Sequence, residues 1–424
     1  MMRPVNISSS RRTILKSVVA TTVLAVGLFG CGGSDNNESR LENRYYASWT
    51  GSMLDATQAR AGVTPVPVAQ VFDNQSIRHV LRLSLDGDAI RIKVSNLFGK
   101  TPITFSGIQV ARSTGGSSID VSSSRVATFA SQSTVTVPAG AELLSDPIEL
   151  AVTPLTNIAV TMYFASPTVV ATVHALGRQT AFIGAGNQLS AATIPAATTE
   201  QRQSYYGLTA VEASSTQKTN VVVTFGDSIT DGFNSTVDAA KRYPNQLDDR
   251  IKAAGLTRTG VVNAGISGNR WINDITGPNG NGRFDRDVLN IPGVTHTIIL
   301  LGVNDIRNSF RFPAEAVTTD QLITSMTTAV RKSKEKGVKV LLGTILPCKG
   351  ETFCPASVDA QRQVINTWIR NNRDVDGIVD FDRVIQNPAD PTAMNPTYDS
   401  GDHLHPNDVG YGAMAAAIDL ARLQ

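Results

Sequence analysis

The second half of this chain alternates short apolar runs with amphipathic helical stretches, and this alternation limits the possible folds more than any other feature. Runs that suit buried strands occur at residues 221–225, 260–263, 297–301, 338–342 and 377–381. Apolar residues at helical spacing occur at 243–254, 319–336, 358–370 and 409–423. Strands that alternate with helices predict a doubly wound parallel sheet of roughly five strands.

Polar and glycine-rich clusters follow three of these strands, and a fourth cluster precedes the last helix. They are Gly226-Asp227-Ser228, residues 263–270, residues 302–305 and residues 402–406. The carboxyl ends of parallel strands meet at one edge, where ligands bind in open α/β sheets. Gly-Asp-Ser by itself is an ordinary turn sequence. The expected convergence of four such clusters favours Ser228 as a nucleophile instead.

Residues 45–213 predict a different architecture, an all-β sandwich. Short strand-like runs are separated by Gly, Pro and Ser, and helical periodicity is nearly absent. The alternating runs at 81–85 and 90–94 predict a hairpin with one buried face. Residues 214–219 indicate a linker to the domain formed by residues 220–424, which we expect to be catalytic.

Two histidines and a group of aromatic residues stand out in the β-rich half. We expect His79 and His174 to be structural or surface residues, because neither is near a Ser–Asp pair or a second His in the sequence. Aromatic residues near the two ends of this half either form a sugar-binding platform or, as we favour, pack in a core or between domains. They are Tyr45, Tyr46, Trp49, Tyr205 and Tyr206.

The chain begins with the features of an export signal. Four basic residues precede the apolar stretch 17–30, and no acidic residue occurs before Asp35, so residues 1–30 are expected to be a signal peptide. Without those four bases, 34 of the 38 remain against 36 acids, and the net charge changes from +2 to −2. No basic run suggests nucleic-acid binding. Arg11 and Arg12 suit twin-arginine export, although paired arginines also occur in Sec signals.

The cysteines refine the predicted location of the protein. Leu28-Phe29-Gly30-Cys31 resembles a bacterial lipobox, so we expect Cys31 to be lipidated and residues 31–44 to form a tether; a free thiol after ordinary cleavage is the alternative. No other apolar run is long enough for a membrane helix. The protein would then be periplasmic or on the cell surface; without lipidation it would be secreted. In each of these places Cys348 and Cys354 are expected to form a disulfide.

The four polar clusters carry a family resemblance. Residues 219–424 resemble the SGNH (GDSL-type) hydrolases, which are esterases and lipases with a flavodoxin-like sheet. The whole chain also resembles secreted two-part arylesterases or acylhydrolases associated with plant polysaccharide breakdown. The family's blocks are matched in order by Ser228, Gly268, Asn304 and the Asp-x-x-His pair Asp402 and His405.

This resemblance implies a catalytic triad in which His405 is the base for Ser228 and Asp402 orients the imidazole. It also implies an oxyanion hole formed by the amides of Ser228 and Gly268 and the side chain of Asn304. His403 is a competing base, because alternate residues of an extended segment share a face. The family's spacing selects His405.

Other residues near these blocks have expected roles. Asp227 and Asp305 are expected to be structural hydrogen-bonders. Arg270 and Trp271 could line the pocket, and residues 273–286 are expected to form a loop over it. No cofactor or metal is expected, because carboxylate–His clusters are too sparse for a three-ligand zinc site and no G-x-G-x-x-G follows a strand.

Together these features predict an exported serine esterase that cleaves short acyl groups, such as acetyl, from carbohydrate. The β-rich half would present the polysaccharide or form a wall of the cleft. One alternative is a lipase, arylesterase or thioesterase acting on hydrophobic esters in the same cleft; the sequence near the four clusters has no lid-like apolar insertion, which favours small acyl groups. The other alternative is a carbohydrate-binding surface protein with a vestigial esterase domain.

Overall fold

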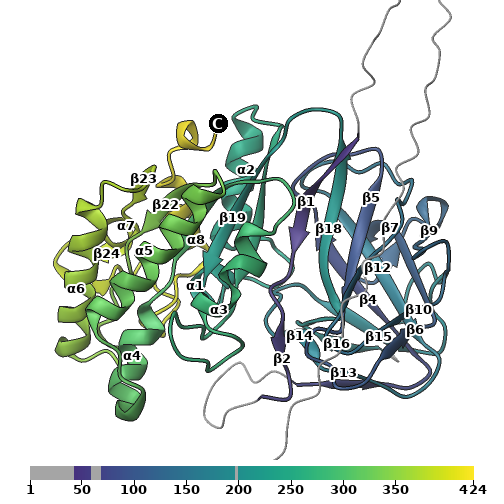
Figure 1. The fold of residues 1–424 in the computed structure, drawn as a ribbon, viewed down its shortest axis with the longest axis horizontal. Coiled ribbons are helices and arrows are strands. Elements are labelled where there is room, and N and C mark those ends of the chain that lie inside the picture. Colours follow the sequence, from purple (N-terminus) through teal and green to yellow (C-terminus); the bar gives the residue numbers. More distant parts are fainter. Residues whose placement is uncertain (1–42, 59–67, 196–198) are drawn as a thin grey trace, which may run out of the picture. The chain divides into compact units, whose positions relative to one another are not determined.

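The computed structural model describes residues 43–58, 68–195 and 199–424 (Figure 1). The predicted signal peptide, Cys31 and most of the predicted tether lie outside the described residues. Across the described ranges, no helix is both long enough and apolar enough to cross a membrane.

Residues 220–424 contain a five-stranded parallel sheet, which confirms the prediction from the alternating pattern. The strand order is β20-β19-β21-β22-β23, so the first strand lies between the second and the third. This order belongs to flavodoxin-like sheets, in which ligands bind where the chain changes direction along the sheet. The strands are β19 (Asn220–Gly226), β20 (Thr259–Gly265), β21 (Val294–Leu300), β22 (Lys339–Gly343) and β23 (Gly377–Val379).

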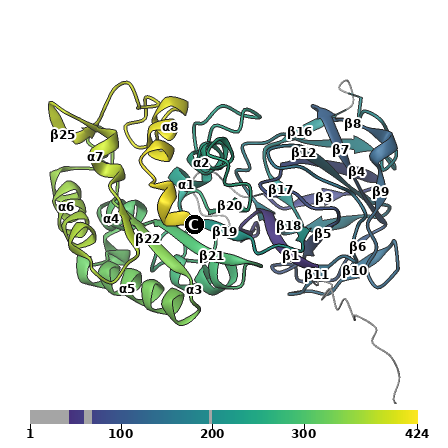
Figure 2. The same ribbon diagram turned by 90° about the horizontal axis from the view of Figure 1, so that it is seen from above.

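Helices cover both faces of this sheet, with α2 and α8 on one face and α3 and α5 on the other (Figure 2). Three predicted helices are present as α2, α5 and α6 with ends within two residues of those expected. A capping box of Thr318 and Gln321 starts α5. The helices are α1 (Ser228–Asp231), α2 (Tyr243–Ala253), α3 (Gly280–Phe284), α4 (Val303–Arg311), α5 (Thr319–Glu335), α6 (Ala356–Asn371), α7 (Phe381–Ile385) and α8 (Asp408–Ala416).

Two segments of this half differ from the prediction. The last helix, α8, ends at Ala416, and a separate 3₁₀ turn (Leu420–Leu423) follows because Asp419 is extended and caps that turn at Ala421. Residues 273–286 are a loop only as far as Asn279, whose side chain caps α3. A π-helical turn (Asp285–Leu289) then continues α3.

The first half is rich in antiparallel strands, purple to teal in Figure 1. One sheet has the order β1-β18-β5-β11, and the largest contains β16-β15-β4-β12-β7-β8 with β9 paired to β7. Their strands are β1 (Arg44–Thr50), β4 (Gln75–Arg82), β5 (Ile90–Ser95), β7 (Gly107–Gly115), β8 (Ser118–Ile119), β9 (Arg125–Val126), β11 (Glu142–Leu144), β12 (Asn157–Phe164), β15 (Ala181–Ala185), β16 (Glu200–Arg202) and β18 (Leu208–Ser215).

Four small sheets hold the remaining strands of the described residues. They are β2 (Leu54–Asp55), β14 (Thr172–His174) and β17 (Tyr205–Tyr206) in one sheet, β3 (Gln70–Phe72) with β13 (Thr168–Val170), β6 (Ile103–Phe105) with β10 (Val135–Val137), and, in the second half, β24 (Gln386–Asn387) with β25 (Asp390–Met394). Besides the 3₁₀ turn at Leu420–Leu423, the described residues form 3₁₀ turns at Val121–Ser123 and Pro313–Glu315.

The predicted hairpin at residues 81–94 is wrong. Strands β4 and β5 belong to different sheets: β4 pairs with β12 and β15, whereas β5 pairs with β18 and β11. The turn at residues 86–88 therefore carries the chain from one sheet to the other. Six consecutive residues of β4 are buried, which an alternating pattern with one buried face does not anticipate.

Strand β18 continues through Ser215, into the segment predicted as a linker, and β19 begins at Asn220. Contacts join the strands of the first half to the parallel-sheet half. The Ala47 amide donates to Pro292 O at 3.0 Å, and Thr50 Oγ1 donates to Asn263 O at 3.0 Å. Buried apolar residues from both halves belong to one hydrophobic cluster.

Four of the five aromatic residues at the ends of the first half pack rather than form an open platform, and the fifth, Tyr45, is half-buried beneath the guanidinium of Arg91. Tyr46, Trp49, Tyr205 and Tyr206 are all buried. The rings of Trp49 and Tyr205 meet edge to face with their centroids 4.8 Å apart. This agrees with the packing alternative.

Candidate active site

A tight turn after β19 presents Ser228. Asp227 caps α1 by accepting a hydrogen bond from the Ile229 amide at 3.0 Å. Gly226 leaves no room for a side chain, since an added Cβ would lie 2.1 Å from Thr230 Oγ1 and 2.4 Å from Leu300 O. The chain can therefore turn directly from the strand into the helix and place Ser228 at the carboxyl end of β19.

Ser228, His405 and Asp402 form a hydrogen-bonded chain. Ser228 Oγ lies 2.7 Å from His405 Nε2, and His405 Nδ1 lies 2.6 Å from Asp402 Oδ2. The amides of Leu404 and His405 donate to Asp402 Oδ1 at 3.0 and 2.8 Å. Burial acts to raise the pKa of Asp402, but the hydrogen bonds and charge of His405 and these amides hold it well below its ordinary value.

His403 lies apart from Ser228. Its Nδ1 is 2.6 Å from Asp399 Oδ2, and its side chain is 52% exposed. The backbone of His403 is left-handed, with φ of 61°. The segment is therefore not extended there, and the face-sharing argument that made His403 a competitor does not apply.

Ser228 and His405 open onto a cavity of about 130 Å³ that Gly268 and Asn304 also line. Gly268 has φ of +78°, a conformation that favours glycine, and an added Cβ would lie 2.8 Å from Thr276 Oγ1. Much of the remaining wall is polar and includes Ser267, Arg307, Asn308 and Arg311. The structure thus brings all five residues predicted for the triad and the oxyanion hole either into the hydrogen-bonded chain or to the cavity wall.

The side-chain amide of Asn304 is held at both ends. Its Nδ2 donates to Asn269 O at 3.1 Å, and its Oδ1 accepts from Arg307 Nη1 at 3.0 Å. Asn304 and Arg307 lie one turn apart on α4, so they share a face of the helix. The sequence offered that spacing, but it did not identify Arg307 as the partner.

The two aspartates next to the site serve the backbone. Asp305 accepts from the amides of Trp271 and Ile272, at 2.9 Å for the closest contact with Trp271 and 3.3 Å for Ile272. Burial raises the pKa of both Asp227 and Asp305 to about 7. Neither carboxyl lines the cavity, so their contacts fit the expected structural role.

Arg270 and Trp271 do not line the cavity, and that prediction is wrong. Both are buried, and the Trp271 indole donates to Leu301 O at 3.0 Å. Arg270 donates to Asn273 O and Asp274 O and pairs with Glu315. The turn after Gly268 directs these side chains into the interior, where they support the residues that follow.

A network that sequence reasoning missed reaches the cavity from the first half. His174 is buried, with Nε2 3.0 Å from Asp231 Oδ1 and Nδ1 2.8 Å from Ser52 O. Asp231 Oδ2 accepts from the amide and hydroxyl of Ser267, at 3.0 and 2.7 Å. Burial acts to lower the pKa of His174, but the carboxylate of Asp231 raises it above its ordinary value. No local pattern signals this pairing, because the two residues are 57 positions apart.

Cys348 and Cys354 form a disulfide, as predicted. In the part of the chain that the structure describes, no three His, Cys, Asp or Glu side chains gather as a possible metal site.

Comparisons with known proteins place the second half of the chain in a family. Residues 224–413 match the sequence model of the GDSL-like Lipase/Acylhydrolase family. A search of curated proteins returned no significant match.

Solved structures give weaker similarity. A GDSL-like lipase from Bacteroides thetaiotaomicron VPI-5482 is 22% identical, with 48% of this chain and 88% of that chain covered and a TM-score of 0.36. A variant of an acetyl xylan esterase from Geobacillus stearothermophilus is 20% identical, with 49% and 97% covered and a TM-score of 0.38. By the family match, the second half of this chain is a GDSL-like lipase/acylhydrolase domain, and the protein is a carboxylic ester hydrolase.

Proposed function

We propose that this protein is an exported serine esterase that removes short acyl groups, acetyl among them, from carbohydrate through a Ser228–His405–Asp402 triad. One observation carries the proposal: Ser228 Oγ, 2.7 Å from His405 Nε2, lies at the wall of a cavity and is linked through the imidazole to Asp402. A serine hydroxyl needs such a base to become an effective nucleophile.

The chemistry follows from these contacts. Ser228 Oγ attacks the ester carbonyl while His405 Nε2 takes the hydroxyl proton, and the imidazolium then protonates the leaving alcohol. The acyl group stays on Ser228 until water, deprotonated by His405, attacks its carbonyl carbon. The bond between the acyl carbon and Ser228 Oγ then breaks, the imidazolium returns its proton to Oγ, and the carboxylic acid leaves. Asp402 accepts from Nδ1 throughout, so the proton-accepting nitrogen always faces Ser228.

The oxyanion formed in each step needs hydrogen-bond donors. We assign this role to the amides of Ser228 and Gly268 and to the Nδ2 group of Asn304. All three residues line the same cavity. Among the described residues, Asn269 O is the acceptor found for Asn304 Nδ2, which leaves its second N–H for the oxyanion.

The size and polarity of the cavity support a short acyl group and a polar alcohol. Its volume of about 130 Å³ is small beside the roughly 300–1,000 Å³ of pockets for drug-sized ligands. The arginine and asparagine side chains in its wall suit hydroxyl-rich sugars better than long alkyl chains.

The proposal that the protein is exported rests on the basic and apolar pattern of residues 1–30. Lipid attachment at Cys31 would anchor the protein to a membrane.

The experiment compares acetyl, butyryl and octanoyl p-nitrophenyl esters and acetylated xylan, each with wild type and Ser228→Ala. We expect acetyl esters to react fastest, acetate to be released from xylan, and Ser228→Ala to abolish both reactions. A preference for octanoyl esters without acetate release would overturn the carbohydrate assignment. Turnover that persists in Ser228→Ala would overturn the triad.

A further inference from the structure

Asn304 can serve as an oxyanion donor only if its amide is turned the right way. Rotation of the amide by 180° would exchange Oδ1 and Nδ2 and present an acceptor to the developing negative charge. Such groups are effective when their orientation is fixed before the reaction. Whatever holds the Asn304 amide in the donating orientation therefore affects the rate of the reaction.

Arg307 fixes this orientation. Its Nη1 donates to Asn304 Oδ1 at 3.0 Å. A guanidinium has only donors, so the amide atom that faces it must be the oxygen. The nitrogen is then directed to the other side, where Asn269 O accepts one of its two hydrogens.

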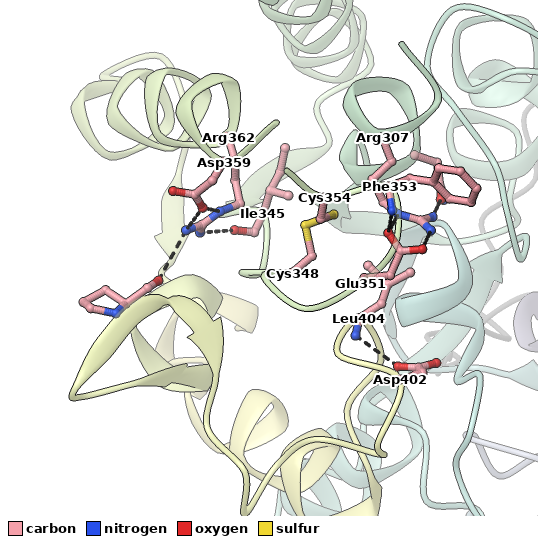
Figure 3. Close-up of a disulfide and its surroundings, with 12 residues drawn as sticks. Arg307, Ile345, Cys348, Glu351, Phe353, Cys354, Asp359, Arg362, Asp402 and Leu404 are labelled. Atoms are coloured by element: carbon pink, nitrogen blue, oxygen red, sulfur yellow. Dashed lines mark hydrogen bonds and ion pairs between the residues drawn. A yellow bond between two sulfur atoms is a disulfide. The ribbon is translucent and has the colours of Figure 1, made fainter. Parts of the chain in front are cut away.

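Glu351 in turn holds Arg307. Its carboxylate accepts from Arg307 Nε at 3.0 Å and from Nη2 at 2.5 Å, a two-point contact that leaves Nη1 for Asn304. The two side chains are only 14% and 13% exposed. Figure 3 shows the Glu351 carboxylate facing the guanidinium, and the Phe353 amide adds a third donor at 2.8 Å.

The disulfide closes the short loop that carries Glu351. Cys348 and Cys354 are both buried, and Glu351 lies midway between them. Backbone bonds from the Glu351 amide to Cys348 O and from the Cys354 amide to Glu351 O tighten the loop. At Gly350, which has φ of +104°, an added Cβ would lie 3.0 Å from the ring of His403, so the loop also packs against the Asp402–His405 segment.

We infer that the disulfide-closed loop 348–354 is a positioning element for the oxyanion hole: it holds Glu351, which fixes Arg307, which fixes the amide of Asn304. The inference rests on the proposed role of Asn304. Glu351 and Arg307 act here as positioning residues through Asn304. Opening the disulfide releases Glu351, and the amide then loses its fixed orientation.

A double-mutant cycle on p-nitrophenyl acetate tests the inference, with Glu351→Gln, Asn304→Ala and the double variant. Loss of the fixed orientation of the Asn304 amide should lower kcat less than loss of the donor itself, which lowers kcat by about 10²–10³-fold. We expect Glu351→Gln to lower kcat roughly tenfold with little change in KM, and to have no further effect when Asn304 is already alanine.

Glu212→Gln is the matched control, because Glu212 is a buried acid paired with Arg91 at 2.6 Å in the first half. We expect its kcat to stay at the wild-type value. Arg307→Lys provides a second variant, since lysine keeps the charge but cannot bind Glu351 at two points while donating to Asn304. We expect its kcat to fall as in Glu351→Gln.

The disulfide is tested with dithiothreitol, which reduces it to two thiols. We expect kcat of the wild type to fall after reduction, whereas Cys348→Ser/Cys354→Ser should be slow from the start and insensitive to the reagent. That variant keeps Cys31, so insensitivity would trace the effect to the loop. A wild-type kcat unchanged after complete reduction would overturn the role of the disulfide.

The outcomes separate the two proposals. If Asn304→Ala reacts at nearly the wild-type rate, Asn304 is not in the oxyanion hole and that part of the proposed function fails. Suppose instead that Asn304→Ala is slow. If Glu351→Gln is then as fast as wild type, or if its effect adds in full to that of Asn304→Ala in the double variant, the positioning role fails and the proposed function stands.

Discussion

At the scale of single residues, environment gives chemically identical side chains different properties. His405 lies between a hydroxyl and a carboxylate, so one ring nitrogen can accept a proton while the other donates. His174 faces only acceptors, Ser52 O on one side and Asp231 on the other, an arrangement that favours the imidazolium. His79 is fully buried, and burial lowers its pKa to about 3. Its neutral form is therefore the one that the fold accommodates.

Asn304→Ala should slow acyl transfer by about 100-fold or more, because one of the three donors that we propose for the oxyanion is lost. We expect the fold to stay intact, since the Asn304 side chain is at the wall of a cavity. Steady-state kinetics on p-nitrophenyl acetate, with thermal unfolding as the control, measures both. A rate near wild type would remove Asn304 from the oxyanion hole.

His79 should make the protein less stable in acid. Its pKa is about 3 when folded and 6.5 in an unfolded chain, so below pH 6.5 the unfolded state binds more protons. The contribution of neutral His79 to the free energy of unfolding is complete above pH 6.5. As the pH falls from 6.5 toward 3, the free energy of unfolding decreases by about 1.4 kcal/mol per pH unit on account of this residue. His79→Gln, which keeps an acceptor for the Tyr206 amide, should reduce the slope of unfolding free energy by that amount. Urea unfolding at pH 7, 6 and 5 measures it, and equal slopes would contradict the argument.

At the scale of elements, three of the five residues of the site, Ser228, Gly268 and Asn304, follow the carboxyl ends of parallel strands, whereas Asp402 and His405 precede α8. Strand β19 ends two residues before Ser228, β20 ends three residues before Gly268, and β21 ends four residues before Asn304. The three strands are neighbours in the sheet, with β19 in the middle. Short connections therefore suffice to bring the three groups to one cavity, provided that each strand end is tightly packed.

Gly226→Ala should be costly for this reason. The added Cβ would lie 2.4 Å from Leu300 O, a backbone atom that cannot move without shifting β21. We expect a loss of about 1–3 kcal/mol in unfolding free energy, with a drop in activity because Ser228 shifts. Gly282→Ala is the control, since its Cβ would meet its nearest neighbour at 3.4 Å and it lies inside α3. For Gly282→Ala we expect the free energy of unfolding to increase by up to about 1 kcal/mol. Equal stability of the two variants would contradict the packing argument.

At the scale of the whole molecule, the β-rich half contributes directly to the surroundings of the site. His174 on β14 binds Asp231 on α1, and Asp231 binds both polar groups of Ser267, which lines the cavity. The pair is buried, with side-chain exposures of 5% and 2%. Removing one partner of such a pair leaves a charge without compensation in the interior.

His174→Gln should therefore lower the unfolding free energy by about 3–5 kcal/mol at pH 6. The folded pKa of His174 is raised above 6.5, so its ionic contribution is present below pH 6.5 and is lost as the pH rises through the folded pKa. The loss of unfolding free energy in His174→Gln should therefore be smaller in alkaline buffer than at pH 6. His403→Gln, in an exposed His–Asp pair, should cost less than about 1 kcal/mol. Chemical unfolding of both variants across pH tests this, and similar small costs for the two would refute it.

The sequence by itself determined the parallel sheet and the order of its strands along the chain. Burial periodicity is a local property, and the direction of parallel strands brings their carboxyl ends to one edge whatever the details of packing. The convergence of Ser228, Gly268 and Asn304 could be expected for the same reason. The family resemblance, rather than any pattern of spacing, selected His405.

Only the tertiary structure decided how distant groups meet. The left-handed backbone at His403 separates it from His405, and β4 and β5 enter different sheets although their patterns match those of a hairpin. The partners Glu351 for Arg307 and His174 for Asp231 lie 44 and 57 residues away. Such pairings depend on which surfaces the completed fold brings together, and a hydrogen bond between distant residues leaves no periodic trace in the chain.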